Sequence, residues 1–392
     1  MSPQGINLKV PFHRACIGDE EIQAVAEVLR GGWMTMGPKT VQFENEFARY
    51  TGARHAIAVS SCTAALHLAY ECIGLKPGDE VLIPATTFTA TAETVTYFGA
   101  RPVLVDIDPL TMNLDVADAR RRVTSRTRAI VPVHLAGQPC DMQQIHKLAD
   151  ACNLRVIEDA AHALPARYGD KAIGSISDLT AFSFYATKTL TTGEGGMVTT
   201  DNDQYAERIR MMRLHGISRD AWKRYSSEGN WYYQVHEAGY KYNLTDLQAA
   251  IGLVQLAKCD AMRARRESVA DRYNRAFRDD PGLQIPTVLL DRTSAWHLYI
   301  LRVNEERLGF GRNEFMKELQ ARGVNASVHF IPLHLHPYYQ RVFGYRRGDF
   351  PVAEAQYERC LSLPLYATMG EDEMDCVIRA VQEICQLAPA QR

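Results

Sequence analysis

One lysine stands in an unusual place, between an apolar run and a glycine-rich turn. Lys188 follows the apolar residues 181–184 and precedes the turn at 192–196. A lysine at the end of a strand usually extends its long side chain to solvent. Burial would instead lower its pKa and make it an amine nucleophile, the group that forms a Schiff base with a carbonyl compound. The residues that the fold brings near Lys188 must decide between these two interpretations.

Hydroxyl and thiol side chains follow a second apolar run, at residues 55–59. Ser61, Cys62 and Thr63 come directly after it and begin a helical pattern. Free N–H groups and hydroxyls at a helix N-terminus favour a phosphate dianion, although Ser and Thr also serve there as ordinary N-caps. The chain has neither G-x-x-x-x-G-K-[ST] nor G-x-G-x-x-G, so an ATPase loop and a dinucleotide fingerprint are both excluded.

A third apolar run, at residues 155–158, ends in carboxylates and a nearby histidine. Asp159 is placed to pair with a cationic ring nitrogen, and the small Ala161 would let a flat ring lie against the backbone. An acid–base pair of Glu158 with Asp159 is disfavoured, because neighbouring strand residues point to opposite faces. A solvated strand end is the alternative interpretation.

An aromatic residue and a histidine cluster raise two further questions. Phe88 lies at a strand-to-helix junction, where it could stack on a flat ring or pack in the core. His329, His334 and His336 could suggest a metal, but two prolines bend this segment and no carboxylate or cysteine lies close by in the sequence. We therefore expect no metal site and interpret the cluster as substrate contact or packing.

From residue 55 onward, short apolar runs alternate with helical patterns. This alternation predicts an α/β fold with a mostly parallel central sheet between layers of helices. Ligands of such sheets gather at the carboxyl ends of the strands. The predicted strands are 55–59, 80–83, 102–105, 129–134, 155–158, 180–184 and 196–199. The predicted helices between them are 63–73, 89–97, 115–122, 141–152 and 204–214.

Helical patterns also precede and follow this region. Residues 19–29 and 41–50 have amphipathic spacing, with the loop 32–39 between them. A capping box at Thr245 predicts a long helix that continues toward Tyr273. We expect a large domain over residues 1–250 and a smaller α+β domain over 251–392. The smaller domain is expected to contain strands near 295–303 and 326–329, with helices at 312–320 and 371–385.

The composition is that of an ordinary globular protein. The 392 residues are 46% hydrophobic and 23% charged, and the net charge of −2 offers no field for nucleic acid or an anionic membrane. The nine cysteines are scattered and form no C-x-x-C pair, which argues against disulfides and structural zinc. We find no signal peptide and no run long enough to span a bilayer. These features favour a cytoplasmic location.

Taken together, the residues that could carry chemistry (Ser61, Cys62, Thr63, Phe88, Asp159, His162, Ser183 and Lys188) resemble in order and spacing those of fold-type I enzymes that use pyridoxal 5′-phosphate (PLP). From about residue 10 to residue 388 the sequence is similar to the DegT/DnrJ/EryC1/StrS family of nucleotide-sugar aminotransferases. Individually these motifs are weak, but their joint order is specific. The further matching stretches are 32–39, 132–137, 194–196, 215–216, 240–250 and 296–299.

The resemblance implies a role for each of these residues. Lys188 would hold PLP covalently and then move a proton between the substrate carbon and the cofactor. Asp159 would bind the pyridine nitrogen, His162 would approach the phenolic oxygen, and Phe88 would stack on the ring. The groups expected at the phosphate are Cys62, where the family commonly has glycine or alanine, Thr63, Ser183 and, from the neighbouring subunit, Asn243. The positions expected to contact substrate are Thr35, Lys39, Tyr185, His329 and Tyr338.

The resemblance also implies a homodimer that transfers an amino group, from L-glutamate, to a nucleotide-linked keto sugar. Similar transaminases act on UDP-linked 4-keto pentoses and 4-keto-6-deoxy hexoses, in the biosynthesis of lipopolysaccharide and amino sugars. A 3-keto sugar and a dTDP or GDP carrier stay open. Residues 218–240 are interpreted as a partner-facing insertion or a self-packed loop. The basic candidates for the diphosphate are Lys39, Lys241, Arg219 and Arg224.

Two rival functions exist on the same fold. A PLP-dependent sugar dehydratase resembles these aminotransferases but carries histidine in place of the lysine, so Lys188 argues against it. A non-catalytic regulator is the rival of another class, since a fold alone does not determine function. The intact set of cofactor residues argues against that rival.

Overall fold

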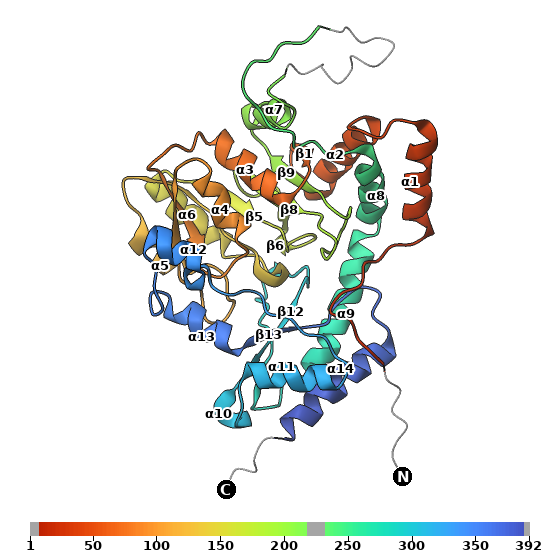
Figure 1. Ribbon diagram of the computed structural model, residues 1–392, viewed down its shortest axis with the longest axis vertical. Coiled ribbons are helices and arrows are strands. Elements are labelled where there is room, and N and C mark those ends of the chain that lie inside the picture. The colour runs from red at the N-terminus through yellow and green to blue at the C-terminus, as the bar shows by residue number, and fades with distance from the viewer. Residues whose placement is uncertain (1–7, 218–231, 388–392) are drawn as a thin grey trace.

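A seven-stranded sheet forms the centre of the protein (Figure 1). The structure is a computed structural model that describes residues 8–217 and 232–387. The strand order is β1-β9-β8-β5-β4-β2-β3, and only β9 runs antiparallel to its neighbours. The strands are β1 (His55–Val59), β2 (Glu80–Pro84), β3 (Arg101–Val105), β4 (Thr127–Ile130), β5 (Arg155–Asp159), β8 (Leu179–Ser183) and β9 (Gly196–Thr200). The predicted mostly parallel sheet is confirmed.

Helices cover both faces of this sheet because its strands are apolar on both sides. In β1, Ile57 and Val59 lie in the core shared with α3 (Cys62–Cys72), α4 (Ala90–Thr96) and α7 (Asp203–Met212). Ala56 and Ala58 face the opposite core, which α2 (Pro38–Thr51) closes. Along β2 to β5 this second layer continues with α5 (Val116–Arg122) and α6 (Met142–Cys152). The alternation of side chains along one strand thus supplies two cores.

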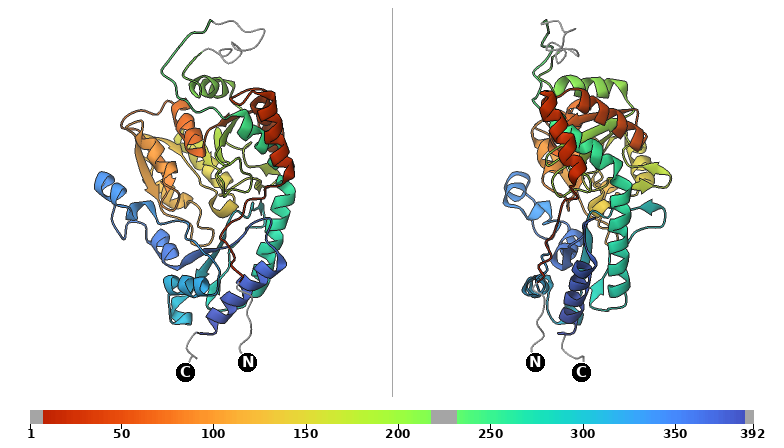
Figure 2. Two further views of the ribbon diagram at one scale, coloured as in Figure 1. Left: turned by 45° about the vertical axis from the view of Figure 1, so that its right-hand side comes forward. Right: turned by 90° about the vertical axis from the view of Figure 1, so that its right-hand side faces the viewer.

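A smaller antiparallel sheet and its helices form the lower part of the molecule in Figure 1. Its strands are β10 (Leu283–Gln284), β12 (Tyr299–Val303) and β13 (Cys360–Leu363), in the order β10-β12-β13. Its helices are α9 (Cys259–Phe277), α10 (Glu305–Leu308), α11 (Arg312–Ala321) and α14 (Glu371–Cys385). Figure 2 shows α9 as a long rod along one side, connecting this part to α8 (Asp246–Ala257) and α1 (Asp19–Gly31) above. The division of the chain at residue 250 stays a prediction.

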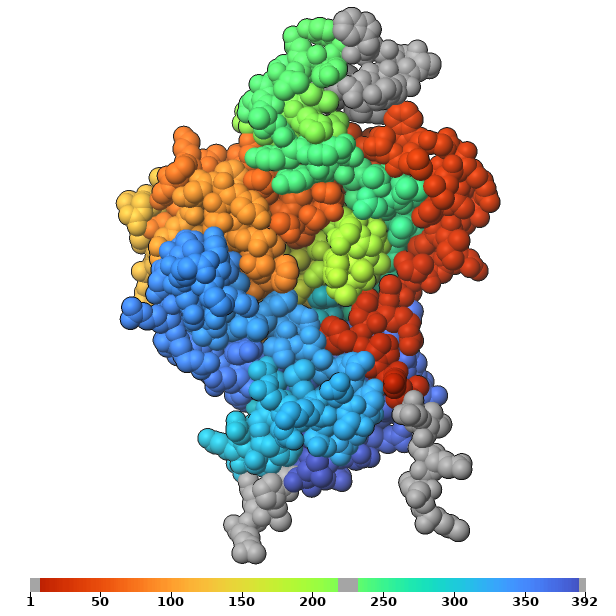
Figure 3. Space-filling model, viewed as in Figure 1, coloured from red at the N-terminus to blue at the C-terminus, as the bar shows by residue number. Residues whose placement is uncertain are grey.

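The segment before β13 returns to the large sheet. Helices α12 (Pro337–Phe343) and α13 (Pro351–Arg359) bury Tyr339 and Phe350 in the core of α3 and α4. The space-filling view shows this blue part of the chain lying against the orange segments around residue 100 (Figure 3). A short third sheet contains β6 (Arg167–Tyr168), β7 (Lys171–Ala172) and β11 (Arg292–Thr293). The two parts of the molecule therefore meet along a broad boundary.

Three local predictions were wrong. The strand expected at 129–134 ends at Ile130 in β4, because Pro132 has no N–H group to continue the ladder. The helix expected to run unbroken from residue 245 divides at Lys258, whose amine binds Glu21 of α1. Residues 326–329 form only a single bridge, from Ser327 to Ser362, in place of a strand. Among the described helices, none is long and apolar enough to cross a membrane.

Candidate active site

Lys188 lies in a turn just after β8. Its backbone N–H donates to the carbonyl of Tyr185 at 2.9 Å. Burial lowers the pKa of the Lys188 amine to about 8, an effect that Cys62 and Asp159 partly oppose. The uncharged amine, which a nucleophile requires, is therefore far more populated near neutral pH than in an exposed lysine.

Close backbone packing draws this turn to the start of α3. Gly196, the first residue of β9, lies so near the Ser61 backbone that a Cβ atom would come within 2.6 Å of the Ser61 carbonyl. The Ser61 hydroxyl accepts the N–H of Ala64 at 3.0 Å and so caps the helix. This leaves the first turn of α3, with Cys62 and Thr63, beside the strand that leads to Lys188. The anion site predicted at residues 61–63 and the lysine thus belong to one site.

Asp159 ends β5 and is only 5% exposed. Its Oδ2 accepts the Thr91 hydroxyl at 2.8 Å, and its Oδ1 accepts the N–H of Ala161 at 3.1 Å. Burial raises the pKa of the Asp159 carboxyl, while these two hydrogen bonds and the charge of Lys188 oppose the rise. The donors that hold this carboxylate are neutral, so a cationic N–H group would be its natural counterion.

Thr91 is a site residue that the sequence did not single out. It is fully buried in α4, and its hydroxyl also lies 2.8 Å from that of Thr87. Thr91 thus binds one oxygen of the Asp159 carboxylate, and the Ala161 N–H binds the other. A threonine inside a short helix is common, and nothing in its local sequence marks this contact.

His162 faces the same region and has a defined tautomer. The N–H of Ala136 donates to its Nδ1 at 3.3 Å, so the ring proton lies on Nε2. Burial, followed by the charge of Lys188, lowers the pKa of His162 well below its ordinary value. Its ring lies 4.3 Å from that of His297 and stacks at 5.8 Å on Phe330. A neutral imidazole with a free Nε2–H group is suited to donate to a ring oxygen.

Glu158, the neighbour of Asp159, points away from the site as the strand geometry predicts. Its carboxylate lies 2.7 Å from Nε2 of His134 and accepts the Thr180 hydroxyl at 3.1 Å. The N–H of Cys140 donates to Nδ1 of His134, so the ring donates to Glu158 from Nε2. Both side chains are completely buried. His134 and Thr180 therefore supply the hydrogen bonds that the buried Glu158 carboxylate needs, and no group of the site is used for this.

Three aromatic side chains that the sequence singled out are exposed. Phe88 is 59% exposed and its ring lies 6.0 Å from that of Phe330. Tyr185 and Tyr338 are also exposed, on the turn before Lys188 and on α12. An exposed Phe88 is available for stacking, in contrast to the core packing that was the alternative interpretation.

The Ser183 hydroxyl accepts the N–H of Tyr185 at 3.3 Å, at the end of β8. Cys62 is partly exposed, and burial of its thiol raises the thiol pKa well above the ordinary value. Because both Asp159 and Lys188 act electrostatically on this thiol, the three side chains share one site. Cys62 thus has a neutral side chain, and its predicted contact with the phosphate stays a prediction.

Asn243 lies beside its own β1. Its backbone bridges to Val59, and its side-chain oxygen accepts the amine of Lys241 at 2.5 Å. The predicted reach of Asn243 to the site of a neighbouring subunit stays a prediction.

The loop with Thr35 and Lys39 is held by Asp246 of α8. The Asp246 carboxylate accepts the N–H groups of Gly37, Lys39 and Thr40 at 2.8 to 3.1 Å. Thr35 is exposed and Lys39 half-buried, so both side chains stay available for a ligand. Arg219 and Arg224, with most of the predicted insertion at 218–240, lie outside the described residues.

The histidine cluster divides between two environments. His334 is buried, and its Nε2 donates at 2.9 Å to the carboxylate of Glu354 in α13, which lies 20 residues away in the sequence. His329 lies nearer the site, with Nδ1 at 2.8 Å from the Ser362 hydroxyl. The described residues bring together no group of three metal-binding side chains.

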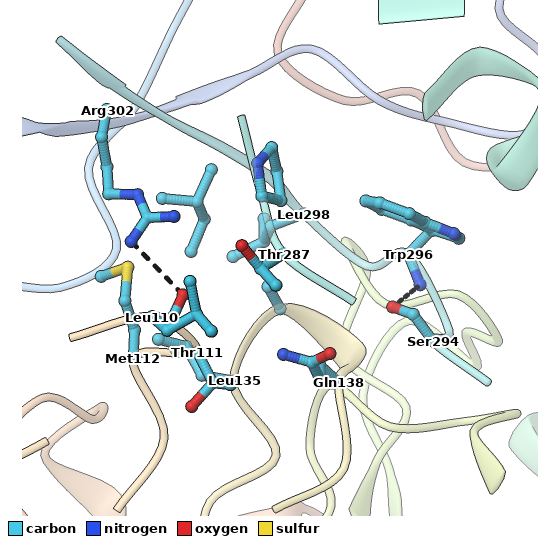
Figure 4. A pocket seen from close by; sticks show the side chains of 13 residues that line it. Leu110, Thr111, Met112, Leu135, Gln138, Thr287, Ser294, Trp296, Leu298 and Arg302 are labelled. Atoms are coloured by element: carbon cyan, nitrogen blue, oxygen red, sulfur yellow. Dashed lines mark hydrogen bonds between the residues drawn. The ribbon is translucent and has the colours of Figure 1, made fainter. Parts of the chain in front are cut away.

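A cavity of about 30 Å³ lies behind the loop that orients His162 (Figure 4). Leu135, Ala136 and Gln138 line one side of it, and Trp296 and Arg302 line the other. It is separate from Lys188 and Asp159, neither of which lines it.

Comparisons with known proteins identify the family of this chain. Residues 15–382 match the model of the DegT/DnrJ/EryC1/StrS aminotransferase family. The chain belongs to this family. SpsC of Bacillus subtilis, a spore coat polysaccharide biosynthesis protein, is 53% identical over 376 residues, which cover 96% of this chain and 97% of SpsC.

Solved structures of DegT/DnrJ/EryC1/StrS-like proteins agree with this assignment. The sugar aminotransferase Spr1654 of Streptococcus pneumoniae, in its PLP form, superimposes with a TM-score of 0.90 at 32% identity, covering 98% of this chain and all of Spr1654. PseC of Helicobacter pylori, an aminotransferase of pseudoaminic acid biosynthesis, gives a TM-score of 0.90 at 28% identity, with 97% and 100% covered. The fold-type I architecture and the PLP-dependent sugar aminotransferase activity of the family are thereby confirmed.

The site residues fit PLP. The Asp159 carboxylate is buried and lacks a cationic hydrogen-bond partner, the first turn of α3 offers N–H and hydroxyl groups to a phosphate, and Lys188 has a lowered pKa. His162 presents Nε2–H where a phenolic oxygen would need a donor. When bound, PLP supplies an electron sink for carbanion character at the substrate carbon.

Proposed function

We propose that this protein transfers an amino group from L-glutamate to the 4-keto carbon of a UDP-linked sugar, for surface polysaccharide or amino-sugar biosynthesis. The observation that carries the proposal is the convergence of Lys188, Asp159 and His162 in one buried site. A lysine with a pKa of about 8 can both attach a carbonyl group and accept a proton at Nζ near neutral pH.

Each residue has a defined task in this proposal. Asp159 holds a proton on the ring nitrogen, because its buried carboxylate favours a cationic neighbour. His162 donates from Nε2 and keeps its proton there, since Ala136 occupies Nδ1. Lys188 takes the proton from the substrate carbon at Nζ and returns it on the cofactor side. Two half-reactions then use the same lysine, and ping-pong kinetics should follow.

The substrate class is supported by the relatives and by the opening of the site. SpsC acts in polysaccharide biosynthesis, and PseC acts in the biosynthesis of a pseudoaminic acid. The exposed rings of Phe88, Tyr185 and Tyr338 offer flat apolar surfaces, which suit sugar and base rings. Lys39 and Lys241 are the described basic residues that we propose for the diphosphate.

The decisive experiment mixes the holoenzyme with L-glutamate and a panel of keto-sugar nucleotides, and measures 2-oxoglutarate. The panel contains UDP-4-keto-6-deoxy hexose, UDP-4-keto pentose, a 3-keto sugar, and dTDP and GDP carriers. We expect the highest kcat/KM with a UDP-4-keto sugar and none with Lys188→Ala. Turnover confined to a 3-keto sugar or to another carrier would overturn the substrate assignment, and no turnover with any member would overturn the activity.

We propose further that the protein is a homodimer with shared sites. The supporting feature is the exposure of several large aromatic side chains, Tyr97, Tyr232 and Tyr233. Mixing inactive Lys188→Ala and Asn243→Ala proteins after mild dissociation should restore about a quarter of wild-type activity, because hybrid dimers contain one intact site. A monomer in sedimentation, or no recovery on mixing, would contradict shared sites.

All nine cysteines are free, which supports a reducing, cytoplasmic location.

A further inference from the structure

A second, smaller cavity of about 20 Å³ lies next to Lys188. Thr187, the neighbour of Lys188, lines it together with three histidines that come from distant parts of the chain: His13, His297 and His329. We call this cavity the histidine pocket. Its remaining wall consists of the apolar side chains of Phe12, Leu298, Leu363 and Leu365.

The histidines are held in place, and one of them lacks a partner. Nε2 of His13 lies 3.1 Å from the Ala186 carbonyl, and Nδ1 of His329 lies 2.8 Å from the Ser362 hydroxyl. His297 is 6% exposed, and its buried Nδ1 has no hydrogen-bond partner among the described residues. A buried polar nitrogen without a partner is costly, so a ligand that supplies one is favoured.

A buried arginine lies directly behind the pocket. Arg266 is 2% exposed, and its three hydrogen bonds all run from Nη1 to carbonyl oxygens, at 3.0 to 3.4 Å. Two of these carbonyls belong to His297 and Leu365, which both line the pocket. Its Nε has no partner, and no carboxylate of the described chain is bonded to it.

This arrangement creates a positive potential in a confined, low-dielectric space. The Arg266 charge acts on His13 and His297, and the Lys188 charge acts on His297 and His329. A buried cation that only carbonyl dipoles compensate attracts an anion strongly. The phosphate position at α3 is a different place, so the pocket is left for a second anionic group.

We propose that the histidine pocket binds a carboxylate of the amino-acid donor. The inference rests on the proposed function, because a donor must bring its reacting carbon to Lys188. A carboxylate on that carbon is one bond away from the reaction, and the pocket begins at the residue next to Lys188. A carboxylate also fits the narrow pocket better than the bulky diphosphate of a sugar nucleotide does.

The test follows the donor half-reaction by itself. Holoenzyme is titrated with L-glutamate in the absence of any sugar, and the visible absorbance of the bound cofactor reports amino transfer. We expect His329→Gln and His13→Gln to raise the glutamate concentration for half-maximal change about tenfold or more. His146→Gln, on α6 and bonded to Ser177, is the matched control and should behave as wild type. Binding of the sugar nucleotide, measured by calorimetry, should be unchanged in His13→Gln and His146→Gln.

Two amides identify which carboxylate enters. L-glutamine lacks the side-chain carboxylate and isoglutamine lacks the α-carboxylate, so the variants should lose their effect with only one of the two. Because both histidines are partly exposed, the variants are expected to fold, and Arg266→Gln serves as a third variant once its circular dichroism matches wild type. Unchanged glutamate titrations in every variant would overturn the proposal. If wild-type holoenzyme did not react with glutamate at all, the proposed donor, and not the pocket alone, would fail.

Discussion

At the scale of single residues, the site depends on side chains whose protonation the surroundings determine. The groups that act on Lys188 are Cys62 and Asp159, which favour its charged form, and burial, which opposes that form more strongly. His162, His297 and His329 are neutral near pH 7, because burial and the Lys188 charge lower their pKa values. The lysine therefore loses its proton about two pH units earlier than an exposed lysine.

This predicts the pH dependence of cofactor capture by the apoenzyme. Only the uncharged amine attacks a carbonyl, so the second-order rate constant for PLP should rise about tenfold per pH unit below pH 8 and level off above it. Stopped-flow absorbance measures this rate, and free N-acetyl-lysine gives the correction for titration of PLP itself. A rate that keeps rising to pH 10 would show that Lys188 is an ordinary lysine.

A second residue-scale prediction concerns Thr91. Thr91→Val keeps the shape but removes the hydroxyl that donates to Asp159, so the Asp159 pKa should rise and its hold on the ring nitrogen should weaken. We expect kcat to fall about tenfold. Thr94→Val is the matched control, since Thr94 lies in the same helix and bonds only the carbonyl of Ala90. If kcat fell equally in both variants, the cause would be lower stability of the helix and not the lost hydrogen bond to Asp159.

The sequence allowed Lys188, Asp159 and the Ser61 cap to be predicted, because each interrupts an apolar run at the end of a strand. Thr91 and His297 could not be predicted in the same way. Their roles arise from contacts across more than sixty residues of sequence, and their local patterns are those of ordinary helix and loop residues.

At the scale of elements, we predict that the position of α3 against β9 controls phosphate binding at the start of α3. Gly196→Ala would place a Cβ 2.6 Å from backbone atoms of Ser61, which cannot move aside as a flexible side chain can. We expect the first turn of α3 to shift and the dissociation constant for PLP to rise about tenfold or more. Titration with pyridoxal, which lacks the phosphate, should show a much smaller change.

Gly31→Ala provides the control for this prediction. Gly31 ends α1, and a Cβ there meets nothing within 4 Å, so PLP affinity should be unchanged. If Gly196→Ala weakened PLP and pyridoxal equally, the glycine would support the fold generally and the phosphate site would not depend on it.

Elements with strong local signals were predicted well, and those made by long-range pairing were not. The strand at 55–59 and the helix at 371–385 agree with β1 and α14 to the residue. By contrast, β13 exists because Cys360–Leu363 pairs with β12, and this same segment holds Ser327 in a single bridge. A local apolar pattern does not indicate which distant segment a strand will pair with.

At the scale of the whole molecule, the active site lies where separate parts of the chain meet. Val10 bridges to Val324 and lies in the core with α9 and α14, so the N-terminal segment that carries Phe12 and His13 is anchored to the smaller part. From there it reaches Ala186, beside Lys188. Sequence patterns predict two layers and two cores, but the contact between distant segments is a property of the assembled fold.

Arg302 forms hydrogen bonds to both the large-sheet part and the smaller part of the molecule. This residue of β12 is 1% exposed, and Nη1 donates to the carbonyl of Pro109 at 3.0 Å while Nη2 donates to that of Ile285 at 3.2 Å. Figure 4 shows its guanidinium against Leu110, at the edge of the larger cavity. One planar cation thus binds the large-domain loop at 109–110 and a segment of the smaller part together.

Arg302→Met should therefore lower the free energy of unfolding by about 3 kcal/mol, because it leaves several buried carbonyl oxygens without donors. Arg302→Lys should recover little, since a single ammonium group cannot reach acceptors on both sides of the guanidinium plane. Arg278→Met is the matched control, because Arg278 is exposed and bonds only the carbonyl of Asn274 in its own helix. Denaturant unfolding of the holoenzyme measures all three. If Arg302→Met were as stable as wild type, apolar packing alone would hold the boundary, and the loop at 135–138 that orients His162 would need no support from this arginine.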